Sequence, residues 1–307
     1  MTTDVLPMTP QPVPLPPELA EDAVPARRPR WSRVLRQMRK SKLALPGGAI
    51  VLVFIILAIL APWIAPHDPF HNDLMMMLQP PSWAHPFGTD ELGRDILSRV
   101  LYGGQLSILE GLFSVALAMS VGVPVGMISG YVGGRTDTVI MRLIDIMLAF
   151  PGVLLAIVIV SILGPSLVNA MIAVAVYTIP IFARLARGST LSVKEEPYIE
   201  ACRAAGMGHF RILAKHIFPN IANTLWVMAA LRVALAILTA SSLSFLGLGA
   251  QAPSPEWGAM LANGRNYMLI APHVVIFPGA AIVLLVLGIN LFQDGLRLAL
   301  DPKMAER

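Results

Sequence analysis

The feature that most constrains this chain is a set of long hydrophobic runs without charged residues. One run extends from Leu43 to Pro66, and another extends from Ile146 to Phe182. A helix of about 20 apolar residues can cross a bilayer, whereas a helix of a soluble protein is apolar along one stripe only. Charged residues make up 14% of the 307 residues, against about 25% in soluble domains. The chain is therefore predicted to be an all-α integral membrane protein.

Six membrane spans are predicted when the runs are divided at polar turns and at Gly164-Pro165-Ser166. They cover approximately residues 43–66, 106–129, 139–163, 167–185, 224–247 and 274–292. Residues 105–297 thus form a core of five spans that follows the first span. Gly122, Gly126, Gly130 and Gly134 recur at every fourth position. This pattern of small residues is typical of helices that pack closely in membranes, and we prefer that interpretation to a gate.

The polar segment 67–104, which follows the first span, is predicted to contain a surface helix. Thr89-Asp90-Glu91 has the residue types of a helix start. Leu92, Ile96, Leu97, Val100 and Leu101 then fall on one helical face. We expect an amphipathic helix that lies on the membrane surface.

The distribution of basic residues orients the predicted spans. Six spans place both termini on one side of the membrane. Of the 23 Lys and Arg residues, Arg94, Arg99 and Arg265 lie on the side of segments 67–104 and 248–272, and the other 20 lie on the opposite side or at span ends facing it. Because cytoplasmic loops carry the excess of Lys and Arg, we expect both termini and segment 189–220 to be cytoplasmic.

The two ends of the chain are predicted to be cytoplasmic extensions of the spans. Residues 1–42 are rich in proline and then basic, which favours a disordered tail followed by a juxtamembrane helix. A nucleic-acid patch is the weaker interpretation of the basic block, because an uncharged run begins directly after it. Residues 298–307 form a short tail. We therefore expect the lipid bilayer, and no nucleic acid, as a partner.

Segment 189–220 is the longest polar interruption between hydrophobic segments, and its residues predict two short helices. Pro197 suits the first turn of a helix, and Gly206 can adopt the left-handed conformation that ends one. A second helix is expected from His209 to Ile217, with Pro219 ending it. Helices this short need a partner surface to be stable.

A few polar residues or prolines within or beside the spans are candidates for function. Arg142 and Asp145 lie three residues apart on one helical face, so they either line a transport path or form a structural ion pair. Pro151 interrupts the backbone hydrogen bonding of a span and is either a hinge or a shaping residue.

One loop carries residue types that bind metals. His67, Asp68, His71 and Asp73 are closely spaced, and such side chains ligate transition metals. Pro69 and the loop context favour a solvated turn, so we expect no metal site.

Within segment 189–220, Glu200-Ala201-Cys202, then Gly206, then His216-Ile217-Phe218-Pro219 resembles the EAA loop of bacterial ABC-importer permeases. The spacing from Glu200 through Gly206 to Pro219 agrees with that loop, although Cys202 replaces its second alanine, and His216 and Phe218 replace an isoleucine and a leucine. The stretches HPFGTD, LGRD, LSFLGLG, PSPEWGAM and DGLRLALDPK resemble the C-type permeases of importers for dipeptides, oligopeptides, nickel and glutathione.

This resemblance implies a type I ABC-importer permease in the bacterial inner membrane, with both termini cytoplasmic. It implies a cargo of peptides or glutathione, with nickel as an alternative. A secondary transporter that works alone is the rival from another class. The implied partners are a homologous second permease, two ATPase subunits and an extracytoplasmic substrate-binding protein.

The resemblance also implies how the work is divided among these subunits. The chain would not be an enzyme and would bind no cofactor, while ATP and Mg²⁺ would be bound by the ATPases. Consistent with this, the sequence contains no G-x-x-x-x-G-K-[ST] phosphate loop. The residues implied to couple the chain to an ATPase are Glu200, Ala201, Cys202, Ala205, Gly206 and Pro219.

Overall fold

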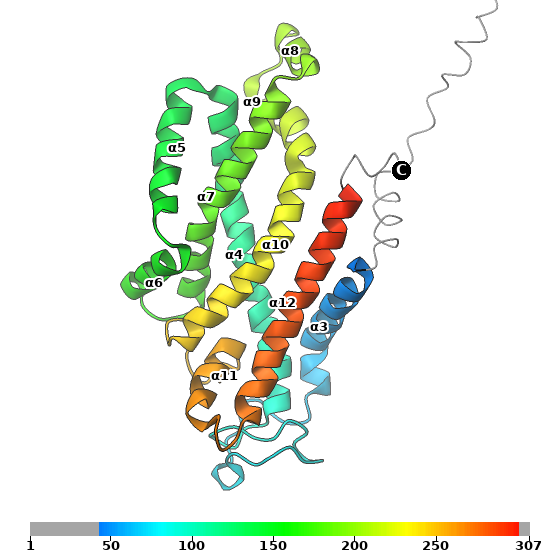
Figure 1. Ribbon diagram of the computed structural model, residues 1–307, viewed down its shortest axis with the longest axis vertical. Coiled ribbons are helices and arrows are strands. Elements are labelled where there is room, and N and C mark those ends of the chain that lie inside the picture. Colours follow the sequence, from blue (N-terminus) through cyan, green and yellow to red (C-terminus); the bar gives the residue numbers. More distant parts are fainter. Residues whose placement is uncertain (1–42, 301–307) are drawn as a thin grey trace, which may run out of the picture.

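The computed structural model describes residues 43–300, and the regular secondary structure of this part of the chain is helical, apart from one isolated bridge between Thr89 and Asp95. The elements are α3 (Ala44–Ile64), η1 (Leu74–Met76), α4 (Ile96–Val132), α5 (Gly134–Ala149), α6 (Gly152–Leu163), α7 (Leu167–Lys194), α8 (Pro197–Ala204), α9 (His209–Ile212), the π-helical turn η2 (Leu213–Ile217), α10 (Phe218–Phe245), α11 (Trp257–Gly264), η3 (Arg265–Tyr267) and α12 (His273–Leu300). The long helices form one bundle, with α8 and α9 at one end and α11 with the loop before α4 at the other (Figure 1). The all-α prediction is confirmed, while the predictions for 1–42 and 301–307 lie outside the described residues.

Five helical stretches in the described range are long and apolar enough to cross a bilayer. They are α3, α4, α7, α9 through α10 as one stretch, and α12. The predicted third span, 139–163, corresponds to two helices, α5 and α6, which meet at an angle of 90°. The bent pair is apolar and long enough to count as one further, broken span, which gives up to six spans in the described range. Phe150 at the break is extended, with φ −87° and ψ 137°. A residue before proline avoids the helical conformation, and Pro151 lacks an N–H, so the helix ends there.

Helix α4 contains both the predicted surface helix and the predicted second span. It begins at Ile96, and the side chain of Asp95 caps it by accepting a hydrogen bond from the backbone N–H of Ser98. The helix continues to Val132 without a break. The prediction of a separate amphipathic helix starting at Thr89 is therefore wrong, because Asp95 is the capping residue and Thr89 belongs to the preceding loop.

The glycine repeat brings α4 against α7, as predicted. A Cβ atom on Gly126 would overlap the carbonyl group of Ala183, so only glycine permits this approach of the two backbones. Gly122 and Gly130 meet the same helix one turn away on either side. Gly134 does not take part, since it begins α5 and has no neighbour in the way of a Cβ. Phe182 and Ala186 of α7 are fully buried in this interface region.

Helix α11 is anchored at the other end of the bundle by a buried tryptophan. The indole N–H of Trp257 donates to the carbonyl oxygen of Val100 at 2.9 Å. The ring of Phe54 from α3 meets the indole edge-on at a centroid distance of 5.9 Å. Trp257 thereby joins α3, α4 and α11 around one hydrophobic cluster.

Candidate functional site

The two short helices predicted in segment 189–220 project from one end of the bundle. We call residues 197–217 the α8–α9 hairpin. Helix α8 begins at Pro197, as predicted, and Gly206 has the predicted left-handed backbone, with φ +74°. The N–H of Met207 donates to the carbonyl of Cys202 at 3.0 Å, and the N–H of Gly206 donates to that of Arg203 at 2.9 Å. These two bonds form a Schellman motif that ends α8.

The second half of the hairpin does not end where the sequence predicted. Helix α9 passes through the π-helical turn η2 directly into α10. Pro219 lies at the start of α10, directly after η2, and thus inside this continuous helical stretch. The prediction that Pro219 ends a helix is therefore wrong, and the hairpin is continuous with a spanning helix.

Polar and aromatic contacts hold the hairpin in place. The hydroxyl of Tyr131, near the end of α4, lies 3.0 Å from Nδ1 of His209. The guanidinium of Arg203 lies over the ring of Tyr131, 5.4 Å from its centroid. The side-chain amide of Asn220 donates to the hydroxyl of Tyr198 at 3.0 Å. Sequence patterns gave no signal for these braces, because Tyr131 is 78 residues from His209.

The hairpin has a buried face and an exposed face. Ile199, Ile212 and Ile217 are fully buried in the main hydrophobic cluster. The exposed residues include four of those implied to couple to an ATPase, Glu200, Ala201, Ala205 and Gly206, and also the unpredicted Phe210, whose exposed fraction is 84%. Cys202 is half-buried, with Sγ 4.0 Å from Nε2 of His216. The structure thus brings the α8 residues together on a convex surface, with Pro219 exposed beyond η2.

The candidate path residues do not form the pair that the sequence suggested. Asp145 forms its ion pair with Arg184 of α7, at 2.6 Å between Oδ1 and Nη2, rather than with Arg142. Both partners of that pair are largely exposed, and Arg142 is exposed as well. Pro151 lies at the break between α5 and α6, so it ends a helix instead of kinking a continuous one.

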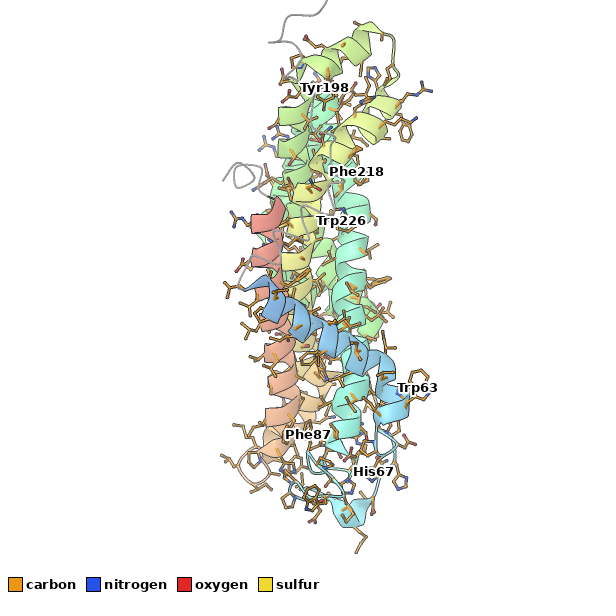
Figure 2. The ribbon with its side chains drawn as sticks, turned by 90° about the vertical axis from the view of Figure 1, so that its right-hand side faces the viewer. Trp63, His67, Phe87, Tyr198, Phe218 and Trp226 are labelled. Carbon is orange, nitrogen blue, oxygen red and sulfur yellow. The ribbon has the colours of Figure 1, made fainter. Side chains whose placement is uncertain are left out.

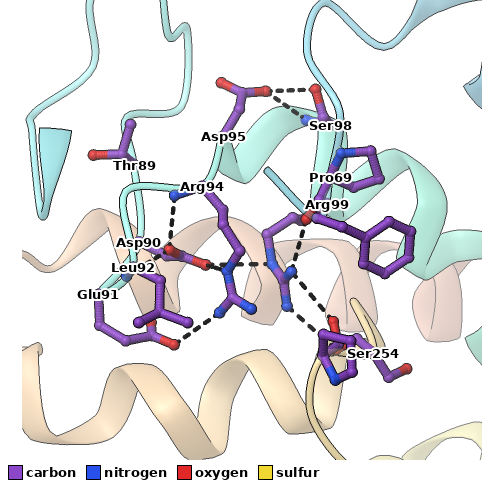
Figure 3. Close-up of polar contacts among 12 residues, drawn as sticks. Pro69, Thr89, Asp90, Glu91, Leu92, Arg94, Asp95, Ser98, Arg99 and Ser254 are labelled. Atoms are coloured by element: carbon purple, nitrogen blue, oxygen red, sulfur yellow. Dashed lines mark hydrogen bonds and ion pairs between the residues drawn. The ribbon is translucent and has the colours of Figure 1, made fainter. Parts of the chain in front are cut away.

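A buried polar network holds the opposite end of the bundle (Figure 3). The carboxylate of Asp90 accepts from Nε of Arg94 at 2.7 Å and lies 3.4 Å from Nε of Arg99. The guanidinium of Arg99 also donates to the carbonyl oxygens of Pro69, at 2.9 Å, and Ser254, at 3.2 Å. One side chain of α4 therefore joins the loop after α3 to the loop before α11. Sequence patterns could not predict this contact, because Arg99 and Ser254 are 155 residues apart.

Two further carboxylates, those of Glu256 and Glu110, are buried. Glu256 caps α11 by accepting from the N–H groups of Gly258, at 2.7 Å, and Ala259, at 2.8 Å. Burial raises the pKa of Glu256 above its ordinary value. Glu110 of α4 is also fully buried, but neither of its carboxylate oxygens has a hydrogen-bond partner among residues 43–300.

The two ends of the molecule are well separated, as Figure 2 shows with Tyr198 at one end and His67 and Phe87 at the other. The hairpin projects from the bundle (Figure 1) and exposes one face of α8, so it is suited to docking on another protein.

Comparisons with known families agree with this arrangement. The family described as binding-protein-dependent transport system inner membrane component matches residues 122–306. The N-terminal transmembrane domain of oligopeptide transport permease C matches residues 29–81. A solved chain of the MetNI methionine ABC transporter, in an inward-facing conformation, aligns with a TM-score of 0.54 and 19% identity, covering 67% of this chain and 98% of that chain. At that identity the likeness supports the fold alone.

Closer relatives cover nearly the whole chain. The dipeptide transport system permease protein of Alkalihalophilus pseudofirmus is 49% identical and covers 97% of this chain and 96% of its own. A glutathione transport system permease protein of Pectobacterium atrosepticum is 48% identical and covers 89% and 90%, respectively. The probable D,D-dipeptide transport system permease protein of Escherichia coli is 47% identical and covers 89% and 91%. The chain therefore belongs to the family of inner-membrane permease subunits of binding-protein-dependent ABC importers, as a multi-pass membrane protein.

Proposed function

We propose that this chain is the transmembrane permease subunit of an ATP-driven importer that moves short peptides, including dipeptides, oligopeptides or glutathione. Two relatives named above are permeases for dipeptides or D,D-dipeptides, and one is named for glutathione, which is itself a peptide. The structural observation that carries the proposal is the exposed α8–α9 hairpin, which is continuous with the spanning helix α10.

The hairpin is proposed to dock in a groove of a partner ATPase subunit. The exposed face of α8 includes small side chains and the acidic Glu200, while Phe210 offers a large apolar contact. The buried isoleucines and the contacts of Tyr131 hold the hairpin firmly enough to transmit a displacement. Closure of the ATPase dimer on ATP would move α8, and α10 would carry that motion into the bundle. ATP and Mg²⁺ would be bound by the partner, and the chain itself would bind no cofactor.

We also propose that the hairpin end faces the cytoplasm. Lys194, Arg203, Arg211 and Lys215 lie in or beside the hairpin, and only Arg94, Arg99 and Arg265 belong to segments 67–104 and 248–272. Cytoplasmic loops carry such an excess of basic residues. The opposite end would then receive substrate from the extracytoplasmic binding protein, and a second, homologous permease would complete the path.

Uptake in proteoliposomes tests the coupling role. The chain is reconstituted with its partner permease, its ATPases and its binding protein, and ATP-dependent entry of a labelled dipeptide is measured. Glu200→Ala and Gly206→Asp should abolish uptake while the complex still assembles. Gly188→Ala is the control, because Gly188 lies in α7 outside the hairpin, where an added Cβ would meet no atom within 4 Å.

Two outcomes would count against the proposal. Uptake at the wild-type rate in both Glu200→Ala and Gly206→Asp would remove the coupling role from the hairpin. Uptake that continues without ATP or without the ATPase subunits would instead indicate a transporter that works alone. Titration of the purified binding protein with a dipeptide and with glutathione then distinguishes the two cargoes.

A further inference from the structure

Three potential metal ligands from separate parts of the chain converge at the end of the bundle opposite the α8–α9 hairpin. His67 follows α3, His85 lies in the loop before α4, and Asp95 caps α4. One ligand atom from each lies within 4.8 Å of the other two. We propose that these side chains bind one divalent transition-metal ion, with Zn²⁺ as the best fit, and that the ion fixes the loop to α4.

The carboxylate of Asp95 is oriented so that one oxygen remains for such an ion. Its Oδ2 accepts from both the N–H and the hydroxyl of Ser98, each at 2.7 Å. Its Oδ1 faces Nδ1 of His85 at 3.0 Å and Nδ1 of His67 at 3.8 Å. The side chain of Asp95 is only 1% exposed. Two imidazoles therefore point the same ring nitrogen at one oxygen of a buried carboxylate.

Hydrogen bonding alone does not account for His67. A separation of 3.8 Å between Nδ1 and Oδ1 is too long for a hydrogen bond, and the described residues provide no other hydrogen bond to this ring. The rings of His67 and His85 are stacked, with centroids 4.6 Å apart and an interplanar angle of 29°. A cation between the three atoms would give Nδ1 of His67 a partner and would bind the other two atoms as well.

The distances suit a tetrahedral ion after small movements. Zn²⁺ binds imidazole nitrogen at about 2.0–2.1 Å and carboxylate oxygen at about 2.0–2.2 Å, so neighbouring ligand atoms lie about 3.3–3.4 Å apart. The observed separations of 3.0 and 3.8 Å from Oδ1 fall on either side of that value. Neutral imidazoles favour Zn²⁺ over the hard cations Mg²⁺ and Ca²⁺, which prefer oxygen ligands.

The surroundings support the three ligands and leave room for a fourth. The hydroxyl of Ser98 accepts a hydrogen bond from the backbone N–H of His67 at 3.1 Å and donates one to the carboxylate of Asp95. One serine therefore positions two of the proposed ligands. Such outer contacts orient metal ligands. The adjoining pocket has a volume of about 260 Å³ and is also lined by Asp68, His71 and Asp73. A water molecule in this pocket can complete the coordination.

Zinc binding to the full-length chain in detergent tests the proposal. The protein carries an affinity tag without histidine, is stripped with a chelator, and is titrated with ZnCl₂ in competition with a fluorescent zinc indicator. Loss of an outer partner of a ligand typically weakens metal binding by about 10- to 100-fold. We expect His67→Ala and His85→Asn to weaken Zn²⁺ binding at least about tenfold. The amide of asparagine can retain the hydrogen bond to Asp95, which protects the fold in the second variant.

Two matched controls separate this site from other histidines. His71→Ala removes a histidine that lines the same pocket, and His216→Ala removes the one beside Cys202. Both should retain one equivalent of bound Zn²⁺, and MgCl₂ should not compete. Zn²⁺ should also raise the midpoint of thermal unfolding of the wild type and leave that of His67→Ala unchanged. Unchanged binding in His67→Ala, loss of binding in His71→Ala, or the absence of saturable binding in the wild type would each overturn the proposal.

Discussion

Replacing Arg99 should destabilise the bundle more than replacing any exposed arginine at the same end. Arg99 has a side-chain exposure of 1%, and its guanidinium contacts Asp90 and the carbonyl oxygens of Pro69 and Ser254. Arg99→Met keeps the aliphatic stem and removes these polar contacts. The two loops that meet at this side chain would then lose their direct connection through α4.

The contacts of Arg99 determine the expected loss in the free energy of unfolding. Hydrogen bonds to charged groups contribute about 1.5–3 kcal/mol each, so the two carbonyl contacts together account for about 3–6 kcal/mol. Part of this is offset, because the methionine needs no desolvation of a charge. Asp90 also keeps its bond from Arg94 and those from the N–H groups of Leu92 and Arg94. We expect a net loss of about 3 kcal/mol, at the lower end of the range of about 3–5 kcal/mol for breaking a buried ion pair.

Thermal unfolding of the detergent-solubilised chain, followed by tryptophan fluorescence, measures this loss. At about 2–4 °C per kcal/mol, the midpoint should fall by about 6–12 °C. Arg265→Met is the control, since Arg265 is exposed and lies over the ring of Phe245 at the same end of the bundle. A double-mutant cycle with Asp90→Asn should show coupling between the two sites. A midpoint that falls no further in Arg99→Met than in Arg265→Met would rule out this stabilising role of Arg99.

Three further predictions follow from buried or crowded positions. Gly126→Ala should cost about 1–3 kcal/mol through overpacking against α7, whereas Gly188→Ala, which meets no atom within 4 Å, should be neutral or stabilising by up to about 1 kcal/mol; equal unfolding midpoints for the two variants would contradict this. Glu110→Leu should raise the unfolding midpoint, because an unpartnered buried polar group costs about 1–3 kcal/mol, and a lower midpoint would show that Glu110 has an unseen partner. Burial and a neighbouring carboxylate raise the pKa of Glu91 above its ordinary value of 4.5, so the folded state holds this proton more tightly than the unfolded state does. The free energy of unfolding should therefore fall as pH rises from 4.5 through the higher folded pKa, and Glu91→Gln should lose this slope; a slope unchanged in that variant would argue against the assignment.

Most of the spans could be predicted because a helix that crosses a bilayer needs a long run of apolar, uncharged residues. Long uncharged runs predicted the central parts of α3, α4, α7, α10 and α12, and the left-handed Gly206 was predicted from its place after α8. The break at Phe150 was missed because a proline in an apolar run predicts a kink or a stop equally well.

Sequence patterns could not predict the polar contacts, because the partners lie far apart along the chain. His67 was grouped with Asp68, His71 and Asp73, its neighbours in the chain. In the fold its ring faces His85 and Asp95 instead. Likewise, Arg142 and Asp145 were paired because one helical turn separates them, whereas Arg184, 39 residues away from Asp145, is the actual partner. A pattern in one helix shows which residues share a face and says nothing of what the next helix offers them.

The π-helical turn between α9 and α10 sets the direction in which the hairpin faces. Ile212 and Ile217, five residues apart, are both fully buried. In a regular α-helix, with about 100° per residue, such positions point about 140° apart. A π-turn carries one extra residue that brings them to the same side. Deleting one residue from 213–217 would leave every docking side chain present, yet it would turn the hairpin by about 100° around the axis of α10. The one extra residue of the π-turn therefore determines the angle at which a partner must approach the hairpin.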